Sequence, residues 1–451
     1  MSRDRTFLIS SVVVFMVSLD ATVVAAAFPT LRASFPNATP AALSWSLNAY
    51  TIVFAALLVP MGRMADQRGR RQVFLGGLTV FTVASAACSL AWSPFSLAVF
   101  RAAQAVGAAA VTPASLALIL AATPPEGRTR AVSGWTAVGA LAAALGPALG
   151  SFILELASWP AIFALNVPVG VITWWTARER LAADEPLASR AAPDLGASVV
   201  LAGAVAAMAA GIVRAGEDVG GRFSGIALAG GGLIVLGILA LRQGRARETA
   251  YDGAFQRASL AAFVFGGAMG LMFLSFYLFM TGVWQYGQSR AGAVATLGPL
   301  VAIVVIIGTA SLANRRGPRR LILAGGLAYA GSHLWYAARL TAEPDYLGLW
   351  LPGQLMGALG IGLVLPNLTG VALARLREAE LAEGNAILAT ARQLGGAVGV
   401  AIAVALVGDV SADLASYRIV YLLLAAAGLA VSLLAVIPSA ERGSSRGSRG
   451  A

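Results

Sequence analysis

Cysteine and histidine are almost absent from this chain of 451 residues, which contains one of each, Cys88 and His333. A single cysteine excludes a disulfide within the chain and a zinc site built from cysteines. A single histidine excludes the H-E-x-x-H motif of zinc proteases. We therefore expect no metal site and no cofactor. Enzyme chemistry that depends on a His/Cys constellation is disfavoured.

Charged residues are also scarce. They make up 12% of the chain, whereas hydrophobic residues make up 58% and the mean hydropathy is +0.78. In soluble globular proteins about a quarter of the residues are charged, so the composition predicts a polytopic membrane protein. The net charge of +11 does not indicate a nucleic-acid partner. The basic residues form short clusters between apolar runs instead of following one polar face.

Lysine is missing altogether, so all 32 basic residues are arginine. Together with the heavy use of alanine and glycine, this is typical of a GC-rich bacterial genome, and we expect a bacterial plasma (inner) membrane location. The apolar stretch after Arg5 runs for about 22 residues without a convincing cleavage site, which is longer than a signal-peptide core. It is therefore expected to be retained as the first span.

With about 20 apolar residues per span, the sequence predicts an all-α protein with fourteen transmembrane helices in groups of six, two and six. The expected domains are an N-terminal six-helix half over 1–177, a linker with two inserted helices over 178–257, a C-terminal six-helix half over 258–438, and a disordered cytoplasmic tail over 439–451. The predicted spans are Phe7–Phe28, Ser44–Met61, Val73–Trp92, Phe95–Ala121, Ala131–Leu154, Ala161–Ala177, Leu195–Val213, Phe223–Leu241, Ser259–Met280, Ala293–Leu312, Leu321–Ala338, Leu347–Val371, Ala386–Gly408 and Tyr417–Ile437.

The segment Gly62–Arg71, which reads GRMADQRGRR, indicates the orientation. It is expected to be a short loop between two spans, and short arginine-rich loops stay on the cytoplasmic side. If this loop is inside, most of the other arginines between spans also fall inside. An added or missing span would reverse that bias downstream. Both the N- and C-termini are therefore predicted to be cytoplasmic.

An internal repeat links the two predicted halves. Three features recur at offsets of 248 to 250 residues, which indicates two homologous six-helix units, the construction of many transporters. The pairs are Asp66–Arg71 with Asn314–Arg319, Gln104 and Gly107 with Gln354 and Gly357, and Gly146–Gly150 with Gly395–Gly399.

Several motifs resemble those of one transporter family. Gly62, Asp66, Arg68, Gly69, Arg70 and Arg71 resemble the G-x-x-x-D-x-x-G-R-R/K signature between the second and third spans of the major facilitator superfamily. Further matches are Leu19–Val24 with Phe28 and Pro29, Trp45 with Ala49 and Tyr50, Arg101 with Gln104 and Gly107, Gly139 with Gly146, Pro147 and Gly150, and Trp159 with Phe163, Asn166, Pro168 and Gly170. Among that superfamily the chain resembles the fourteen-span drug:proton antiporters.

Asp20 is the first candidate for chemistry, because a carboxylate inside the hydrocarbon region is costly and marks a functional site by default. Counted from the same membrane face, Asp20 and Arg101 differ in depth by only a few ångströms at 1.5 Å per residue. In the family, both spans border the central cavity and the arginine is implied in proton transfer. The alternative is a fixed structural ion pair.

The resemblance assigns the remaining candidates to roles. Proton coupling is expected from Asp20, Arg101 and Glu155. A conformational switch is expected from Gly62, Asp66, Arg68, Gly69, Arg70 and Arg71, and close helix packing from the antiporter-motif residues Gly139, Gly146, Pro147 and Gly150. The substrate cavity is expected to include Asp20, Asn48, Gln104, Phe276, Tyr277 and Arg392. Arg392 either extends to the cytoplasm or meets an anionic group in the cavity.

The function implied is proton-driven export of lipophilic drugs or antibiotics, including cations, by alternating access. The expected partners are a small lipophilic substrate, protons and the lipid bilayer, with the monomer as the working unit. The alternatives are a dedicated exporter of one endogenous metabolite or antibiotic, an importer, a membrane-embedded enzyme and a channel.

Overall fold

A computed structural model of the chain describes residues 3–124, 128–181, 195–215, 224–235, 253–374, 376, 381–408 and 413–436. Every regular element in these ranges is helical. The helices are α1 (Arg3–Ala26), α2 (Phe28–Ser34), α3 (Pro40–Arg68), α4 (Arg70–Ser89), α5 (Pro94–Ala121), α6 (Arg128–Leu156), α7 (Pro160–Ala164), α8 (Asn166–Arg180), α9 (Leu195–Ala215), α11 (Gly253–Leu278) with a π-helical turn Phe279–Val283, α12 (Gln288–Arg316), α13 (Pro318–Arg339), a π-helical turn Tyr346–Trp350 leading into α14 (Leu351–Leu373), α15 (Leu381–Val407) and α16 (Leu414–Val436).

Capping residues explain where two of the long helices begin. At α3, the side chain of Thr39 accepts a hydrogen bond from the Ala42 amide at 3.1 Å, and Pro40 occupies the first helical position. At α5, Ser93 and Ser96 form a reciprocal capping box ahead of the helix. These caps satisfy amide groups that have no partner inside the helix.

The prediction of a ten-residue loop at Gly62–Arg71 is wrong, because α3 continues through this segment as far as Arg68. Arg, Met, Ala and Gln are good helix formers, so a polar surface alone does not end the helix. The chain breaks only at Gly69, whose φ of +96° suits glycine, and α4 begins at the next residue. Gly317 makes the same break, with a φ of +82°, between α12 and α13.

Twelve spans in the described residues are long and apolar enough to cross a membrane. This is two fewer than the fourteen that the sequence predicts. The helix α13 lies outside the twelve, although it has 22 residues and contacts α14 and α16. The second inserted span is described only over Ser224–Val235, which is apolar but short. The rest of that span, most of the linker and the predicted tail lie outside the described residues.

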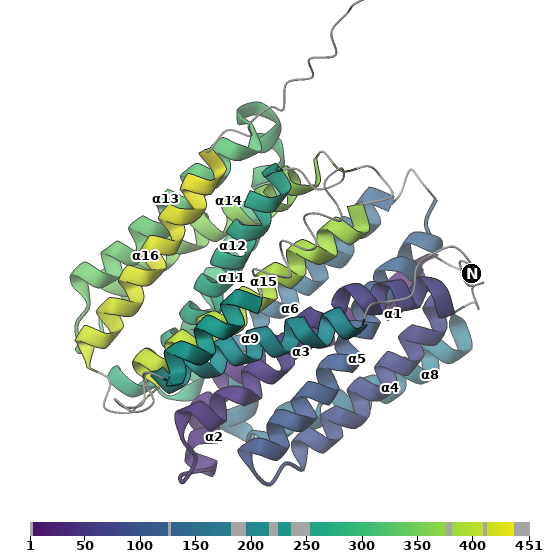
Figure 1. The fold of residues 1–451 in the computed structure, drawn as a ribbon, viewed down its shortest axis with the longest axis horizontal. Coiled ribbons are helices and arrows are strands. Elements are labelled where there is room, and N and C mark those ends of the chain that lie inside the picture. Colours follow the sequence, from purple (N-terminus) through teal and green to yellow (C-terminus); the bar gives the residue numbers. More distant parts are fainter. Residues whose placement is uncertain are drawn as a thin grey trace, which may run out of the picture.

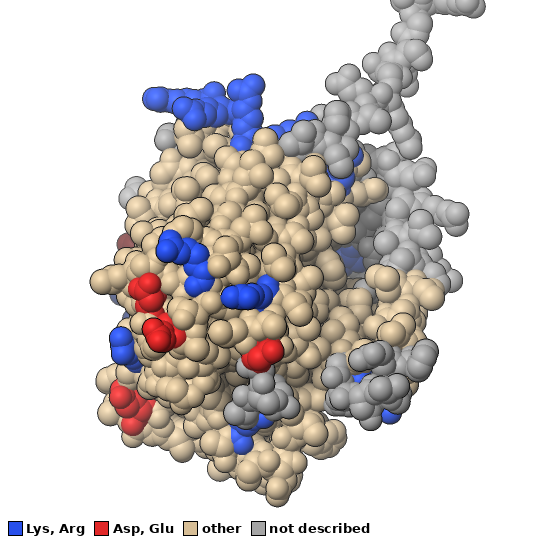
Figure 2. All heavy atoms as spheres, turned by 90° about the vertical axis from the view of Figure 1, so that its left-hand side faces the viewer, with Lys and Arg blue, Asp and Glu red and all other residues tan. Residues whose placement is uncertain are grey.

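The helices form two groups. In Figure 1, α1 to α8 (purple to blue) occupy the lower right and α13, α14 and α16 (green to yellow) the upper left. The helix α9 covers the boundary between them, where Val205 packs in one cluster with Ile52 and Ala55 of α3 and with Leu394 and Ala397 of α15. Figure 2 shows charged side chains in small separate groups on a surface made mostly of other residues.

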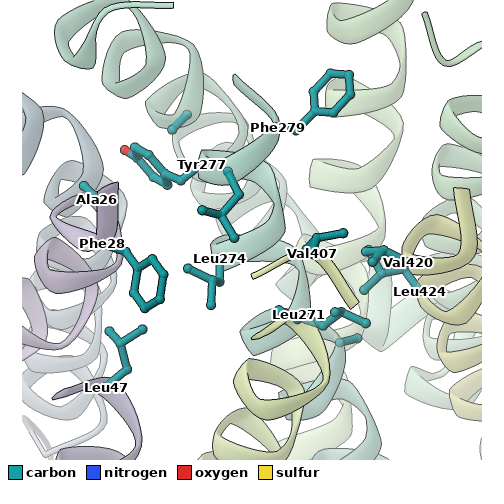
Figure 3. Packing of buried hydrophobic residues seen from close by; sticks show 14 of the residues in the cluster. Ala26, Phe28, Leu47, Leu271, Leu274, Tyr277, Phe279, Val407, Val420 and Leu424 are labelled. Atoms are coloured by element: carbon teal, nitrogen blue, oxygen red, sulfur yellow. The ribbon is translucent and has the colours of Figure 1, made fainter. Parts of the chain in front are cut away.

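The two groups of helices meet at the end of the bundle that holds Phe28, which we call the Phe28 end. The opposite end, which holds Gly69 and Gly317, is called the Gly69 end. At the Phe28 end, one apolar cluster joins Phe28 and Leu47 to Leu274 and Tyr277 of α11, and Figure 3 shows these side chains facing one another. Arg32 also donates a hydrogen bond to the Gly408 carbonyl at 2.6 Å. The two halves are thus closed against each other at this end.

Candidate functional site

Asp20 lies in a polar network buried within the N-terminal half. Its side chain is fully buried, and the guanidinium of Arg101 forms an ion pair with it at 2.5 Å from Nη1 to Oδ2. The other carboxylate oxygen, Oδ1, accepts hydrogen bonds at 2.9 Å from the side-chain amides of Gln104 and Asn166. Three donors from α5 and α8 therefore converge on one carboxylate of α1.

Arg101 is held by further contacts on its other sides. Its Nε donates to the Ser46 main-chain carbonyl of α3 at 3.1 Å, and its Nη1 donates to the side-chain amide oxygen Oε1 of Gln104 at 2.6 Å. The guanidinium carbon lies 4.0 Å from the centre of the Tyr50 ring and 5.6 Å from that of Phe163. These cation–π contacts are strengthened by desolvation. The arginine is thereby fixed in place facing Asp20.

The network is balanced in charge and isolated from bulk water. Asp20 and Arg101 are 2% and 1% exposed, respectively, and Gln104 is fully buried. Breaking a buried ion pair by removing one partner costs about 3–5 kcal/mol, because the remaining charge is left uncompensated. The ion pair and the hydrogen bonds to Asp20 therefore tie the packing of α1 to that of α5 and α8.

The sequence predicts this site in part. Asp20 and Arg101 were expected at similar depth, and the ion pair between them confirms that expectation. The role of Asn166 was missed, although it is a polar residue in a predicted span. Ser85, which accepts a hydrogen bond from Gln104 at 2.8 Å, was also missed. Serine occurs so often in membrane helices that spacing alone does not mark it.

The residues expected to line a substrate cavity do not share one surface. Asn48, like Asp20 and Gln104, is fully buried in the N-terminal half. Tyr277 is buried in the cluster that closes the Phe28 end, and Phe276 packs against that cluster, with its ring 4.8 Å from that of Trp350. Arg392 is exposed within α15. Arg392 is therefore the one member of this group with an exposed side chain.

The residues expected to form a switch lie at the end of α3 and the start of α4. Asp66 of α3 and Arg70 of α4 form a long ion pair of 3.9 Å across the break at Gly69. The Nη2 atom of Arg71 donates to the Arg178 carbonyl at the end of α8, at 2.5 Å. A Cβ on Gly62 would lie 3.5 Å from the Pro113 side chain of α5, which is ordinary contact. Arg68 lies at the last position of α3, with Nη1 3.7 Å from the Met64 sulfur. These contacts connect the Gly69 ends of α3, α4 and α8.

Glycines of α6 allow the close packing that the sequence predicts. A Cβ on Gly146 would overlap the Thr22 side chain of α1, and one on Gly150 would lie 2.7 Å from a Val23 methyl. Gly139 of α6 faces Val14 and Ser18, which also belong to α1. Near the Phe28 end, the Pro147 carbonyl lies against Gly292 of α12. The helix α6 thus contacts both halves.

Glu155 takes part in a contact between the halves and does not join the Asp20 network. It is exposed at the Phe28 end of α6, where the Ser289 hydroxyl of α12 donates a hydrogen bond to its Oε2. This position does not match that of a buried proton carrier. It matches that of a residue that links α6 to α12 at the Phe28 end.

Comparison with known proteins identifies the family. A model described as Major Facilitator Superfamily matches residues 10–247. The cephamycin export protein CmcT of Amycolatopsis lactamdurans is 32% identical over 447 residues, which cover 95% of this chain and 91% of that protein. The tetracenomycin C resistance and export protein of Streptomyces glaucescens is 30% identical, and the match covers 90% of this chain and 77% of that protein.

Solved structures agree on the fold. The inward-open xylose transporter XylE from E. coli has a TM-score of 0.67 at 13% identity, and the match covers 98% of each chain. At this level of identity the likeness concerns the fold alone. The family model matches more than half of the chain, and one relative aligns over almost the whole chain. The chain therefore belongs to the major facilitator superfamily.

Proposed function

We propose that this protein exports lipophilic drugs or antibiotics across the plasma membrane in exchange for protons. Membership of the superfamily makes it a transporter and not an enzyme. Two relatives with similarity over most of the chain are named for antibiotic export or resistance. The observation that carries the proton coupling is the Asp20–Arg101 pair, a titratable carboxylate at the centre of a desolvated network.

In the proposed cycle, the Gly69 end faces the cytoplasm and the Phe28 end faces outside. The described state, closed at the Phe28 end, is then the one that loads substrate from the cytoplasm. Opening to the outside breaks the Arg32–Gly408 and Glu155–Ser289 hydrogen bonds and separates Phe28 from Leu274. Exposing each large apolar side chain to water costs about 1.5–3 kcal/mol. Proton and substrate binding must offset that cost.

The proton acts through the Asp20 network. A proton that enters from the outside converts the carboxylate to a neutral acid. The charge attraction that holds Arg101 against Asp20 is then lost. Because Asp20 joins α1 to α5 and α8, its protonation state biases how these helices pack. Release of the proton to the cytoplasm restores the ion pair and the state described here.

The proposed architecture keeps all fourteen spans. The helix α13 contacts α14 and α16 within the C-terminal half, and Ser224–Val235 is the described part of the second inserted span. With both counted as spans and both termini inside, reporter tags after Glu126 and Arg245 are expected in the cytoplasm and tags near Asn37 and Glu217 outside. If the tag near Glu217 were cytoplasmic and the tag after Arg245 were outside, the inserted pair of spans would be refuted.

The break at Gly69 is proposed to act as part of a conformational switch. Gly69→Leu forces a side chain onto a backbone with a φ of +96°, a conformation that costs roughly 1–3 kcal/mol for a residue other than glycine. We expect slower turnover with substrate affinity largely unchanged, because this region lies far from Asp20 and biases only the conformational equilibrium. Asp66→Asn is expected to act in the same direction.

Turnover in proteoliposomes and equilibrium binding to purified protein test this prediction. Gly76→Leu provides a matched control, because Gly76 lies in α4, the helix that begins directly after Gly69, and a Cβ there would meet open space. If Gly69→Leu inserted normally but lost substrate binding, the proposed switch role would be wrong.

Export itself is tested in a bacterial host that lacks its own efflux pumps. Cells that express the chain should accumulate less of some antibiotics, and a protonophore should restore accumulation. The similarity to a cephamycin export protein favours a second candidate, a dedicated exporter of a single compound. A broad panel distinguishes the two, since a drug exporter lowers the accumulation of several unrelated compounds. Unchanged accumulation across the panel in cells with correctly inserted protein would contradict both.

A further inference from the structure

Arg392 is a charged side chain within the membrane-spanning part of α15. That span runs over Gly384–Val407, so Arg392 lies eight residues, or about 12 Å, from its Gly69 end at 1.5 Å per residue. This is farther than an arginine side chain reaches along the helix. In the part of the chain that the structure describes, Arg392 makes no hydrogen bond or ion pair.

Exposure along α15 shows what kind of space Arg392 faces. Between residues 386 and 407, Arg392 is the only exposed residue, and all others are buried or half-buried. Helices on the lipid surface show a different pattern, since α16 exposes Leu422, Leu423 and Leu433. The helix α15 packs against α3, α9, α11, α14 and α16. We infer that the accessible surface of Arg392 faces a space among these helices and not the lipid.

Neighbouring residues show that this space lies between the two halves. Three residues earlier, Ala389 packs against the apolar core of the N-terminal half. On another side, a Cβ added to Gly266 of α11 would overlap the Arg392 main chain. The side chain therefore projects from the part of α15 between α11 and the N-terminal half, where the proposed cycle requires a path for the substrate.

Charge balance indicates what this space binds. Asp20 is paired with Arg101 and accepts two further hydrogen bonds, so it is not available to neutralise Arg392. A guanidinium in a low-dielectric interior without a counterion is costly. An anionic group on the bound molecule would supply the missing charge. The planar guanidinium group of arginine can donate two parallel hydrogen bonds to a carboxylate.

We propose that Arg392 binds an acidic group of the substrate, and that the exported compounds are lipophilic molecules that carry a carboxylate. This inference rests on the proposed export function and narrows its substrate class from lipophilic compounds of any charge to acids. The sequence led us to expect cationic substrates. The unpaired Arg392 leads us to expect anionic ones instead.

Binding to the purified full-length protein tests the proposal with matched pairs of compounds. The probes are cefoxitin, fusidate and naphthalene-2-carboxylate, each compared with its methyl ester, which keeps the apolar body and removes the charge. A charge-assisted hydrogen bond contributes roughly 1.5–3 kcal/mol, so at least one acid should bind about tenfold or more tightly than its ester. Arg392→Gln should remove that preference, and Arg392→Lys should keep part of it.

Arg319→Gln is the control, because Arg319 is exposed at the start of α13, outside the span of α15. It should leave the preference for acids unchanged, and size-exclusion profiles should confirm that all variants are folded. The proposal fails if the wild-type protein binds no acid more tightly than its ester, or if Arg392→Gln leaves the preference intact. Failure here, combined with protonophore-sensitive export of cationic or neutral drugs in cells, would refute the inference while leaving the export function standing.

Discussion

A disulfide between positions 155 and 289 is expected to stop transport completely, and its reduction should restore transport. The pair Glu155→Cys and Ser289→Cys replaces a hydrogen bond between α6 and α12 at the Phe28 end. In the proposed cycle this contact must break once per turnover, so a covalent bond there holds the protein closed at that end. Substrate efflux from proteoliposomes, measured before and after dithiothreitol, gives the result.

The background for this experiment is Cys88→Ser, which removes the sole native cysteine. Each single-cysteine variant serves as a control and should be insensitive to the oxidant. Full transport with the disulfide formed in nearly all molecules, as shown by mass spectrometry, would mean that the α6–α12 contact does not open. The alternating-access assignment of this end would then be abandoned.

Replacement of Asp20 is expected to have the second largest effect. Asp20→Asn keeps the shape of the side chain but cannot be titrated, so transport driven by a pH gradient should fall to the level of empty liposomes. Asp20→Glu keeps the titratable group but adds a methylene to a fully buried site, which costs roughly 1–3 kcal/mol. The Glu variant should therefore retain part of the driven transport.

Loss of stability must be separated from loss of coupling in these variants. Asp20→Asn leaves Arg101 buried without its counterion. In similar buried pairs this lowers the free energy of unfolding by about 3–5 kcal/mol. Adding Arg101→Gln removes the uncompensated charge and should recover thermal stability but not coupling. If correctly folded Asp20→Asn transported substrate uphill at the original rate, Asp20 would play no part in the mechanism.

Sequence patterns predict the helices well because membrane spans have a length and apolarity that soluble segments lack. The predicted and observed starts of α5 differ by one residue, because the apolar run begins directly after the Ser93–Pro94 cap. The end of α3 was placed seven residues too early, at Met61, because hydropathy reports where the membrane ends and not where the helix ends. Only the backbone at Gly69 shows the true boundary.

The candidate site was predictable where charge is rare and not where polar residues are common. Asp20 and Arg101 stand out because each is a charge within an apolar run, and their depths follow from counting residues. Asn166 and the carbonyl of Ser46 join the network through packing of α8 and α3, which one sequence does not reveal. Likewise, the position of α9 against both α3 and α15 depends on contacts far apart in the chain.

Proton-coupled export is tested most directly by transport in proteoliposomes with an imposed pH gradient. With the lumen acidic and the protein inserted so that its Gly69 end faces outward, we expect a substrate identified in cells to accumulate in the lumen against its own concentration gradient. Nigericin, which collapses the pH gradient, should abolish this accumulation. Accumulation that is equally fast without a pH gradient, or that persists at full rate in Asp20→Asn, would contradict it.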